Sequence, residues 1–410
     1  MKPIYYSEKK KNTEEQCNLG IMYYDEEGML EDQKETLKYC RKAAKQGDAE
    51  AQFNLGNMYF KGEGVLENKK TAIKWYQKAA EQGYATAQLN LGFMYDNGEG
   101  VLEDKKEATK WYRKAAEQGY ALAQYNLGLM YERGEGVLQD KKEAAKWYRK
   151  ATEQGFRLAQ FNLGNMYYNG EGVLEDKKEA EKWFRKAAEQ GYADAQLNLG
   201  VMYESGTGVL EDKKEAAKWF QKAAEQGLVE AQFNLGIMYF HGIGVIEDKK
   251  EAAKWFQKAA EQGLANAQYN LGNMYSKGVG VLKNKKEAAK WYRKAAEQGY
   301  AIAQFNLGVM YNNGEGVLEN KKEAVKWFRK AAEQGDVNAQ YMLGLMYSIG
   351  EVKEEEAYAW CLLSVMNGNK KGIELRNLLK KILTPEQQAS GLKRAKEILK
   401  EIEQNSAKKK

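Results

Sequence analysis

Residues 87–119 read AQLNLGFMYDNGEGVLEDKKEATKWYRKAAEQG, and similar segments follow one another along most of the chain. The glycine of the Asn-Leu-Gly core recurs with a constant step of 36 residues, from Gly20 to Gly344. Tryptophan keeps the same step from Trp75 to Trp327. Such self-similarity is typical of proteins in which each unit contacts mainly its neighbours. The sequence therefore predicts one all-α solenoid of about ten antiparallel helix pairs.

Each unit contains two helical patterns, which we call helix A and helix B. In the second unit helix A is expected over residues 51–60, because Leu55 and Met58 fall on one helical face. Helix B is expected over residues 69–82, with Trp75 and several alanines on its apolar face. A tryptophan at helical spacing beside alanines indicates core packing rather than carbohydrate stacking. The glycine column of helix A indicates close approach of a second helix.

The turn from helix A to helix B carries its own signals. Gly62 is expected to end helix A, since glycine tolerates the left-handed conformation. Val65 and Leu66 are expected to form a short apolar plug. Helix B then begins at a capping pattern, in which Asp104 accepts hydrogen bonds from free backbone amides and Glu107 reaches back.

Composition limits the classes of partner. The formal net charge is +6, from 64 basic and 58 acidic residues that alternate along the units, so we expect no nucleic-acid partner. The three cysteines, Cys17, Cys40 and Cys361, do not recur with the repeat, so neither a disulfide framework nor a metal site is expected. No run of apolar residues is long enough to span a membrane, and the N-terminus has no signal peptide. These features favour the cytoplasm, with secretion by a non-classical route as the alternative.

The chain is expected to divide into a flexible N-terminus at 1–12, the solenoid at 13–372, C-terminal capping helices at 373–404 and a basic tail at 405–410. The sequence Thr384-Pro385-Glu386-Gln387 predicts the start of the last helix. An apolar stripe then follows, which is expected to seal the open end of the stack. It consists of Leu392, Ala395, Ile398, Leu399 and Ile402.

The repeat pattern resembles the Sel1-like repeat (SLR) family, relatives of the tetratricopeptide repeat. Read in one unit, the matching residues are Ala87, Leu91, Gly92, Tyr95, Gly98, Gly100, Val101, Asp104, Trp111, Lys114, Ala115, Ala116 and Gly119. One column departs from the family, with Glu107 in place of lysine, and the first unit is a poorer copy. The resemblance implies a right-handed superhelix whose concave surface is lined by helix A.

The resemblance also implies function. Family members usually work as scaffolds for protein assembly, and many bacterial members mediate signalling or host contact. One cysteine-rich branch, linked by two cysteines within each unit, is associated with β-lactam binding. This chain lacks those cysteine pairs, which argues against that activity.

Helix A also carries the candidate binding face. Positions 50, 53, 57 and 60 and their equivalents lie opposite its buried face, and we call them the helix-A face. Most variation between units falls there: position 57 is Asn57, Phe93 and Leu129 in successive units. A face tuned to a partner would show such variation, and so would drift at an unconstrained surface. Position 53 is always apolar, either for packing on the next unit or as an aromatic floor to a groove.

An asparagine precedes Leu-Gly in each unit from Asn54 to Asn306 and forms a ladder that ends at Met342. In tetratricopeptide domains an asparagine at the matching place can hold a peptide backbone, because an amide both donates and accepts. The alternative is a hydrogen bond to a neighbouring loop. The candidate partner-binding residues are Asn54, Asn90, Asn126, Asn162, Asn198, Asn234, Asn270, Asn306, Phe93, Asn165 and Asn273.

Catalysis is not expected. His241 is the single histidine and is assigned to a surface turn, so a histidine-based triad or metal site has almost no ligands. No cofactor is expected. The sequence thus predicts a monomeric, non-enzymatic scaffold that binds a peptide or protein on the concave helix-A face. The alternative is a secreted bacterial host-interaction or β-lactam-binding protein of the same family.

Overall fold

The computed structural model describes residues 30–349 and 354–407, with side chains described over 36–349 and 354–404. These residues form α-helices joined by short turns, with no strand among them, which confirms the all-α prediction. The expected flexible segment at 1–12, helix A of the first unit, Cys17 and the last three lysines lie outside the described residues.

Helices A and B alternate along the chain as the 36-residue step predicts. Helix A is α3 (Ala49–Lys61), α5 (Ala85–Asn97), α7 (Ala121–Arg133), α9 (Arg157–Asn169), α11 (Ala193–Ser205), α13 (Val229–His241), α15 (Ala265–Lys277), α17 (Ala301–Asn313) and α19 (Val337–Ile349). Helix B is α2 (Leu30–Lys45), α4 (Lys69–Glu81), α6 (Lys105–Glu117), α8 (Lys141–Glu153), α10 (Lys177–Glu189), α12 (Lys213–Glu225), α14 (Lys249–Glu261), α16 (Lys285–Glu297), α18 (Lys321–Ala332) and α20 (Glu354–Met366). The chain ends with α21 (Lys370–Ile382) and α22 (Pro385–Ala407).

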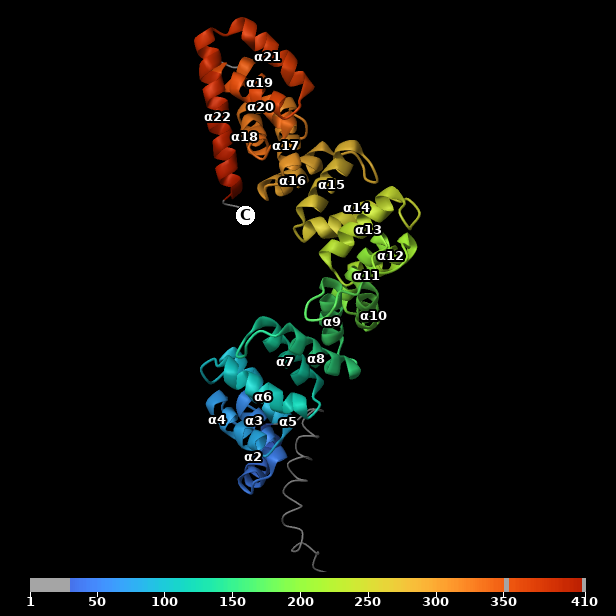
Figure 1. The fold of residues 1–410 in the computed structure, drawn as a ribbon, viewed down its shortest axis with the longest axis vertical. Helices are drawn as coiled ribbons and strands as arrows, with labels where there is room; N and C mark the ends of the chain where they lie inside the picture. Colours follow the sequence, from blue (N-terminus) through green and yellow to red (C-terminus); the bar gives the residue numbers. More distant parts are fainter. Residues whose placement is uncertain (1–29, 350–353, 408–410) are drawn as a thin grey trace, which may run out of the picture. The chain divides into compact units, whose positions relative to one another are not determined.

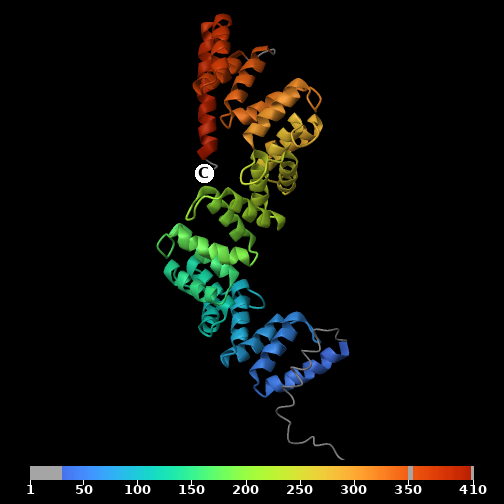
Figure 2. The same ribbon diagram turned by 90° about the vertical axis from the view of Figure 1, so that its right-hand side faces the viewer.

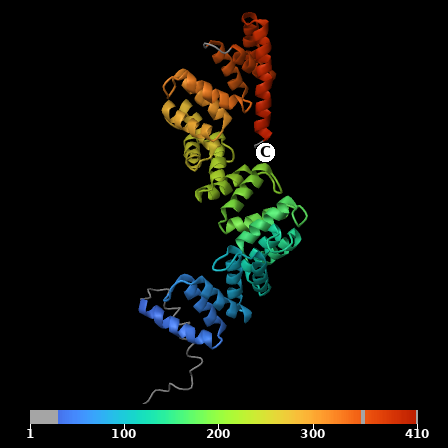
Figure 3. The ribbon, with the colours of Figure 1, turned by 90° about the vertical axis from the view of Figure 1, so that its left-hand side faces the viewer.

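The chain forms two compact parts, residues 1–211 and 212–410, and each is described by itself. In both parts a helix A packs most extensively on the helix B that follows it and less on the one before it (Figure 1). Successive pairs therefore stack in chain order, as in a solenoid. Figure 2 shows this order in the C-terminal part, from α13 onward, and Figure 3 shows it for the helices of the N-terminal part.

The glycine column permits the close packing of the two helices within a unit. A Cβ atom added to Gly272 in α15 would lie 2.7 Å from the ring of Tyr292 in α16, nearer than a side chain tolerates. The same holds for Gly56 against Tyr76 in α3 and α4. The aromatic ring of helix B thus lies directly on the backbone of helix A, which confirms the packing interpretation of this glycine.

The capping prediction for helix B is half correct. The side chain of Asp104 accepts from the amides of Lys106 and Glu107, at 2.9 and 3.1 Å. Glu107 does not reach back, however, because the Asp104 amide donates to the Tyr95 carbonyl at 2.9 Å. Glu107 instead pairs with Lys110 at 3.0 Å. Helix A ends as expected in the left-handed region, for example at Gly62 with φ of 78°.

The last helix begins with a complete capping box. The Thr384 amide donates to Gln387 Oε1 at 2.8 Å, and the Gln387 amide donates to Thr384 Oγ1 at 3.2 Å. Two residues of the predicted stripe, Ala395 and Ile398, are buried against Trp360 of α20. In Figures 2 and 3 α22 runs beside the helices of the last unit. Of residues 373–404, expected to cap the array, 373–382 lie in α21 and 385–404 lie in α22.

Candidate functional site

The helix-B residue after tryptophan, which we call the aromatic position, shapes the helix-A face. It is Tyr76, Tyr112, Tyr148, Phe184, Phe220, Phe256, Tyr292 and Phe328 in successive units. All of these rings are buried. Where the residue is tyrosine, its hydroxyl reaches the helix-A face of its own unit.

Each tyrosine hydroxyl donates to a variable residue of the helix-A face. Tyr76 donates to Asn57 Oδ1 at 2.7 Å, and Tyr292 donates to Asn273 Oδ1 at 2.6 Å. Tyr112 donates to Asp96 at 3.3 Å. Tyr148 donates to Glu132. Part of the variation along this face therefore accompanies the tyrosines of helix B, which are partners within the protein itself.

In two units with phenylalanine at the aromatic position, that ring lies near an aromatic residue of the helix-A face. The rings of Phe240 and Phe256 lie 6.4 Å apart between centroids, and those of Tyr168 and Phe184 lie 6.3 Å apart. In two units, therefore, an aromatic residue on helix A accompanies phenylalanine on helix B.

Burial controls the ionisation of these tyrosines. It raises the pKa of Tyr292 to about 12, and hydrogen bonding to Ser276 and Asn306 partly offsets the rise. Burial also raises the pKa of Tyr76 and of Tyr112. The rings therefore remain neutral hydrogen-bond donors at physiological pH.

The asparagine ladder divides into two sets, and all its members are half-buried. In the first set the asparagine of the next unit lies close enough to a tyrosine hydroxyl to lower its pKa, as Asn90 does for Tyr76 and Asn306 does for Tyr292. Asn126 and Asn162 belong to the same set, beside Tyr112 and Tyr148.

The second set of the ladder has no tyrosine at the preceding aromatic position. Its members are Asn54, Asn198, Asn234 and Asn270, and the equivalent residues before them are Cys40, Phe184, Phe220 and Phe256. The side chain of Asn270 makes no hydrogen bond to any residue that the structure describes. Its amide is therefore available to a ligand.

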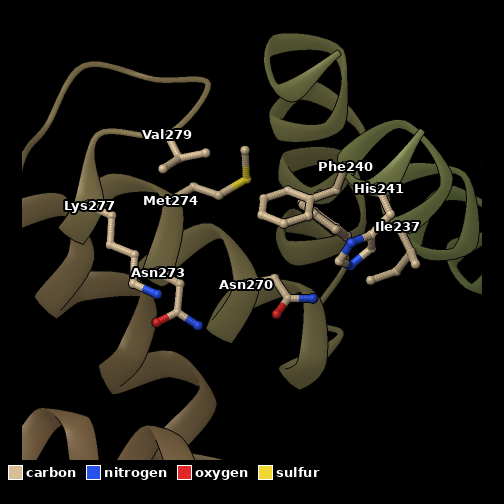
Figure 4. Close-up of a pocket in the computed structure, with 9 residues that line it drawn as sticks. Ile237, Phe240, His241, Asn270, Asn273, Met274, Lys277 and Val279 are labelled. Carbon is tan, nitrogen blue, oxygen red and sulfur yellow. The ribbon is translucent and has the colours of Figure 1, made fainter. Parts of the chain in front are cut away.

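A cavity of about 230 Å³ opens beside Asn270, between α13 and α15. Figure 4 shows residues of α13 on one side and residues of α15 on the other. The cavity is lined by Ile237, Phe240, His241, Phe256, Asn270, Asn273, Met274, Lys277 and Val279. It thus brings together two of the predicted partner-binding residues, Asn270 and Asn273.

The remaining candidates on the helix-A face lie elsewhere along the stack. Phe93 is 49% exposed on α5. Asn165 is half-buried on α9. Position 53 packs internally, since the Phe53 ring lies 5.7 Å from the Tyr76 ring and 5.2 Å from the Tyr84 ring. These contacts favour the packing interpretation of position 53 over an exposed aromatic floor.

A second amide ladder, which the sequence analysis missed, joins the units. Gln82 donates from Nε2 to Gln52 Oε1 at 2.8 Å, and Gln52 donates to the Ala44 carbonyl at 3.1 Å. The same pair recurs at Gln118 with Gln88, and at Gln298 with Gln268. The step of 36 residues for this glutamine was visible in the sequence. Its burial was not, because glutamine is usually exposed.

The expected apolar plug is wrong for its second residue. Leu66 is 89% exposed, and Leu102 is 90% exposed. Turn geometry explains this, because the left-handed glycines turn Val65 toward the core and leave the next residue outside. The result is a row of exposed aliphatic residues, which we call the loop row. Its members are Leu66, Leu102, Leu138, Leu174, Leu210, Ile246, Leu282 and Leu318.

Tryptophan has the structural role that its spacing predicted. Trp111 is buried, and the Lys114 ammonium lies 4.2 Å from the centroid of its ring. The same lysine covers each of the other repeat tryptophans that the structure describes, as Lys258 covers Trp255 at 3.9 Å. An aliphatic lysine stem on an indole face both covers the ring and adds a cation–π attraction.

Few groups suited to chemistry gather in the described residues. His241 is exposed and ends α13, rather than lying in a turn as expected. No group of three histidine, cysteine or acidic side chains there could hold a metal. Burial raises the pKa of the Cys361 thiol to about 12, so it is a poor nucleophile.

The cysteine prediction needs one correction. Cys40 is disulfide-bonded. A single bond near one end of the array cannot recur with the repeat, which is why the spacing argument missed it. Cysteine usage therefore no longer favours a reducing compartment. No described helix is long and apolar enough to cross a membrane.

The repeat pattern identifies the family. Ten consecutive segments match the Sel1 repeat, at residues 16–48, 49–84, 85–120, 121–156, 157–192, 193–228, 229–264, 265–300, 301–336 and 337–369. The chain belongs to the Sel1 repeat family. Sel1 repeats are non-catalytic scaffolds that generally mediate protein–protein interaction. No curated protein matches the chain significantly.

Two solved structures of Sel1 repeat proteins are similar to this chain. One is a protective antigen present in uropathogenic Escherichia coli strains, with an SLR fold; it is 38% identical, with 96% of this chain and 85% of that chain covered and a TM-score of 0.79. The other is a Sel1 repeat protein from Oxalobacter formigenes; it is 36% identical, with 81% of this chain and 93% of that chain covered and a TM-score of 0.60.

Proposed function

We propose that this Sel1 repeat protein is a non-enzymatic scaffold that binds a peptide or protein segment on its helix-A face. The observation that carries the proposal is the asparagine ladder. Its second set leaves amides half-buried and without a tyrosine partner, next to apolar side chains such as Ile237 and Phe240. An amide in such a place can bond a peptide backbone while the apolar residues hold a side chain.

Size supports a peptide over a small molecule. The cavity beside Asn270 holds about 230 Å³. Pockets for drug-sized ligands usually hold about 300–1,000 Å³, so this one suits a single side chain of a longer ligand. Nothing in the described residues favours binding of a β-lactam.

The test is affinity capture by the full-length chain from its native lysate, followed by mass spectrometry. Charged substitutions on the helix-A face, Phe93→Asp and Ile237→Asp, are compared with Leu102→Asp in the loop row. We expect the helix-A variants to lose the captured protein and the loop-row variant to keep it. If only Leu102→Asp fails to capture the protein, the binding surface lies on the loops and the proposal is refuted.

A second candidate is a host-contact protein of the same scaffold type. It is supported by 38% identity over 96% of the chain to a protein described as a protective antigen of uropathogenic Escherichia coli. Surface labelling of intact cells tests it. If the protein is not labelled and is recovered only after the cells are lysed, with none in the medium, this candidate is excluded.

A further inference from the structure

The residue at the aromatic position determines whether a ladder asparagine lies beside a tyrosine hydroxyl of the protein itself. Tyr292 brings a hydroxyl to Asn273 and to the neighbourhood of Asn306. Phe256, at the equivalent place one unit earlier, has no hydroxyl to offer Asn270. Two neighbouring units of the C-terminal part thus present the same asparagine in different states, and the cavity lies at the unoccupied one.

A second change at the same cavity removes a negative charge. In other units a basic residue at the end of helix A pairs with a glutamate two residues later, as Lys61 does with Glu63 at 3.4 Å and Arg133 does with Glu135 at 4.0 Å. In the cavity unit the corresponding residues are Lys277 and Val279. Lys277 therefore lacks the carboxylate that its counterparts use.

The cavity lining carries one formal charge, the ammonium of Lys277. It also contains His241 and no acidic side chain. The nearby Lys249 lies over the Phe240 ring, 4.0 Å from its centroid, and pairs with Glu247 at 3.3 Å. Lys277 is exposed and forms no ion pair with any described residue, so it can receive a carboxylate from outside.

We propose that this cavity binds a partner peptide in which a large apolar side chain stands next to an acidic residue. The apolar side chain fills the space between Phe240 and Val279. The amide of Asn270 bonds the peptide backbone, and Lys277 pairs with the peptide carboxylate. The inference rests on the proposed function and assigns it a site and a ligand chemistry.

The occupant follows from complementarity rather than from apolar area alone. A basic ligand would be repelled by Lys277, and an uncharged one would gain no ion pair with it. The volume of about 230 Å³ admits one large side chain. Specificity then comes from the missing tyrosine hydroxyl and the missing glutamate, both of which other units of this chain retain.

The chain itself supplies the test variants. Phe256→Tyr introduces the hydroxyl that four other units carry, and Val279→Glu restores the glutamate found at Glu63, Glu99, Glu135, Glu171 and Glu315. Both residues are native to the same place in the repeat, so folding should be kept, as circular dichroism and the melting temperature will verify. Phe184→Tyr makes the same chemical change away from the cavity and is the matched control.

The probe is a library of random short peptides displayed on phage and selected on the full-length chain. Selected peptides are synthesised, and their Kd is measured by fluorescence anisotropy. We expect a large apolar residue adjacent to Asp or Glu in the selected peptides. We also expect Kd to rise about tenfold in Phe256→Tyr and in Val279→Glu, the scale of one lost hydrogen bond or ion pair. Phe184→Tyr should leave Kd unchanged.

Several results would overturn the inference. They are enrichment of basic or uncharged peptides, equal affinity for the wild type and for Phe256→Tyr, or no enrichment at all. If selected peptides bind but respond only to Phe93→Asp, the proposed scaffold function stands and this site assignment fails. If peptides bind but their Kd changes neither in the cavity variants nor in Phe93→Asp, the helix-A face is not the binding surface and both proposals fail.

Discussion

The hydroxyl of Tyr292 in α16 donates a hydrogen bond to Oδ1 of Asn273 in α15, at 2.6 Å. The bond joins the buried helix of a unit to the helix that carries the variable face. One acceptor site of the Asn273 oxygen is therefore already used, while its amide protons remain for a ligand. A side chain that the sequence suggests for ligand binding can thus already accept a hydrogen bond within the protein.

The buried tyrosines predict unfolding at alkaline pH. Burial raises the pKa of Tyr292 to about 12, whereas tyrosine in an unfolded chain ionises near pH 10. The stability that this residue provides is therefore complete below about pH 10 and is lost as the pH rises toward 12. Tyrosinate absorbance and helicity should be followed together. We expect the exposed tyrosines to ionise first and the buried ones only as helicity falls. Ionisation of every tyrosine near pH 10 with helicity intact would contradict this.

Close packing at Gly272 predicts a costly substitution. In Gly272→Ala the new methyl group would lie 2.7 Å from the Tyr292 ring, so the two helices must separate. We expect a loss of about 1–3 kcal/mol, despite the better helix propensity of alanine. Urea denaturation measures it. Asn266→Ala, exposed on the same helix, is the control and should change stability little; equal behaviour of the two variants would count against the packing argument.

The half-made capping box predicts unequal effects of its two carboxylates. Asp104→Ala removes both side-chain hydrogen bonds to the first turn of α6 and should cost about 1 kcal/mol. Glu107→Gln should cost much less, because Glu107 bonds only the exposed Lys110. Thermal unfolding of the two variants checks the order. A larger effect of Glu107→Gln would mean that the box closes in solution.

The loop row predicts neutral substitutions at large apolar residues. Leu102 is 90% exposed, so Leu102→Ser should change stability by less than about 0.5 kcal/mol. Leu91, buried eleven residues earlier, should lose about 2–5 kcal/mol as Leu91→Ala. Chemical denaturation compares the two. A comparable loss at Leu102 would show that this side chain is covered in solution.

Periodicity made most of the fold predictable. The step of 36 residues gave the helix pairs, the glycine at Gly56 gave close helix packing, and the polar residue at Asp104 gave the start of helix B. Each of these depends on local geometry that the repeat restates many times. The error at Leu66 arose because an apolar residue after a tight turn can face either way. Only the backbone path through the turn decides its direction.

The candidate site was less predictable, because it depends on contacts between residues at different positions of the repeat. The asparagines were visible as a ladder, but their division into two sets requires that Tyr76 approach Asn90. That approach joins helix B of one unit to helix A of the next. The buried Gln52 was missed for a related reason, since its partners lie in neighbouring units. The residues at one position of the repeat, taken alone, cannot reveal such pairs.

The glutamine ladder has a consequence for how such a molecule can change in size. Gln118 bonds Gln88, and Gln154 bonds Gln124, with the same atoms and nearly the same distances of 2.8 and 2.9 Å. Removal of residues 121–156 would bring Gln160 to the place that Gln124 now holds, beside identical neighbours. Junctions that carry this glutamine pair are thus alike, and recombination between the repeated segments can lengthen or shorten the chain by whole units while the same pair forms at the new junction.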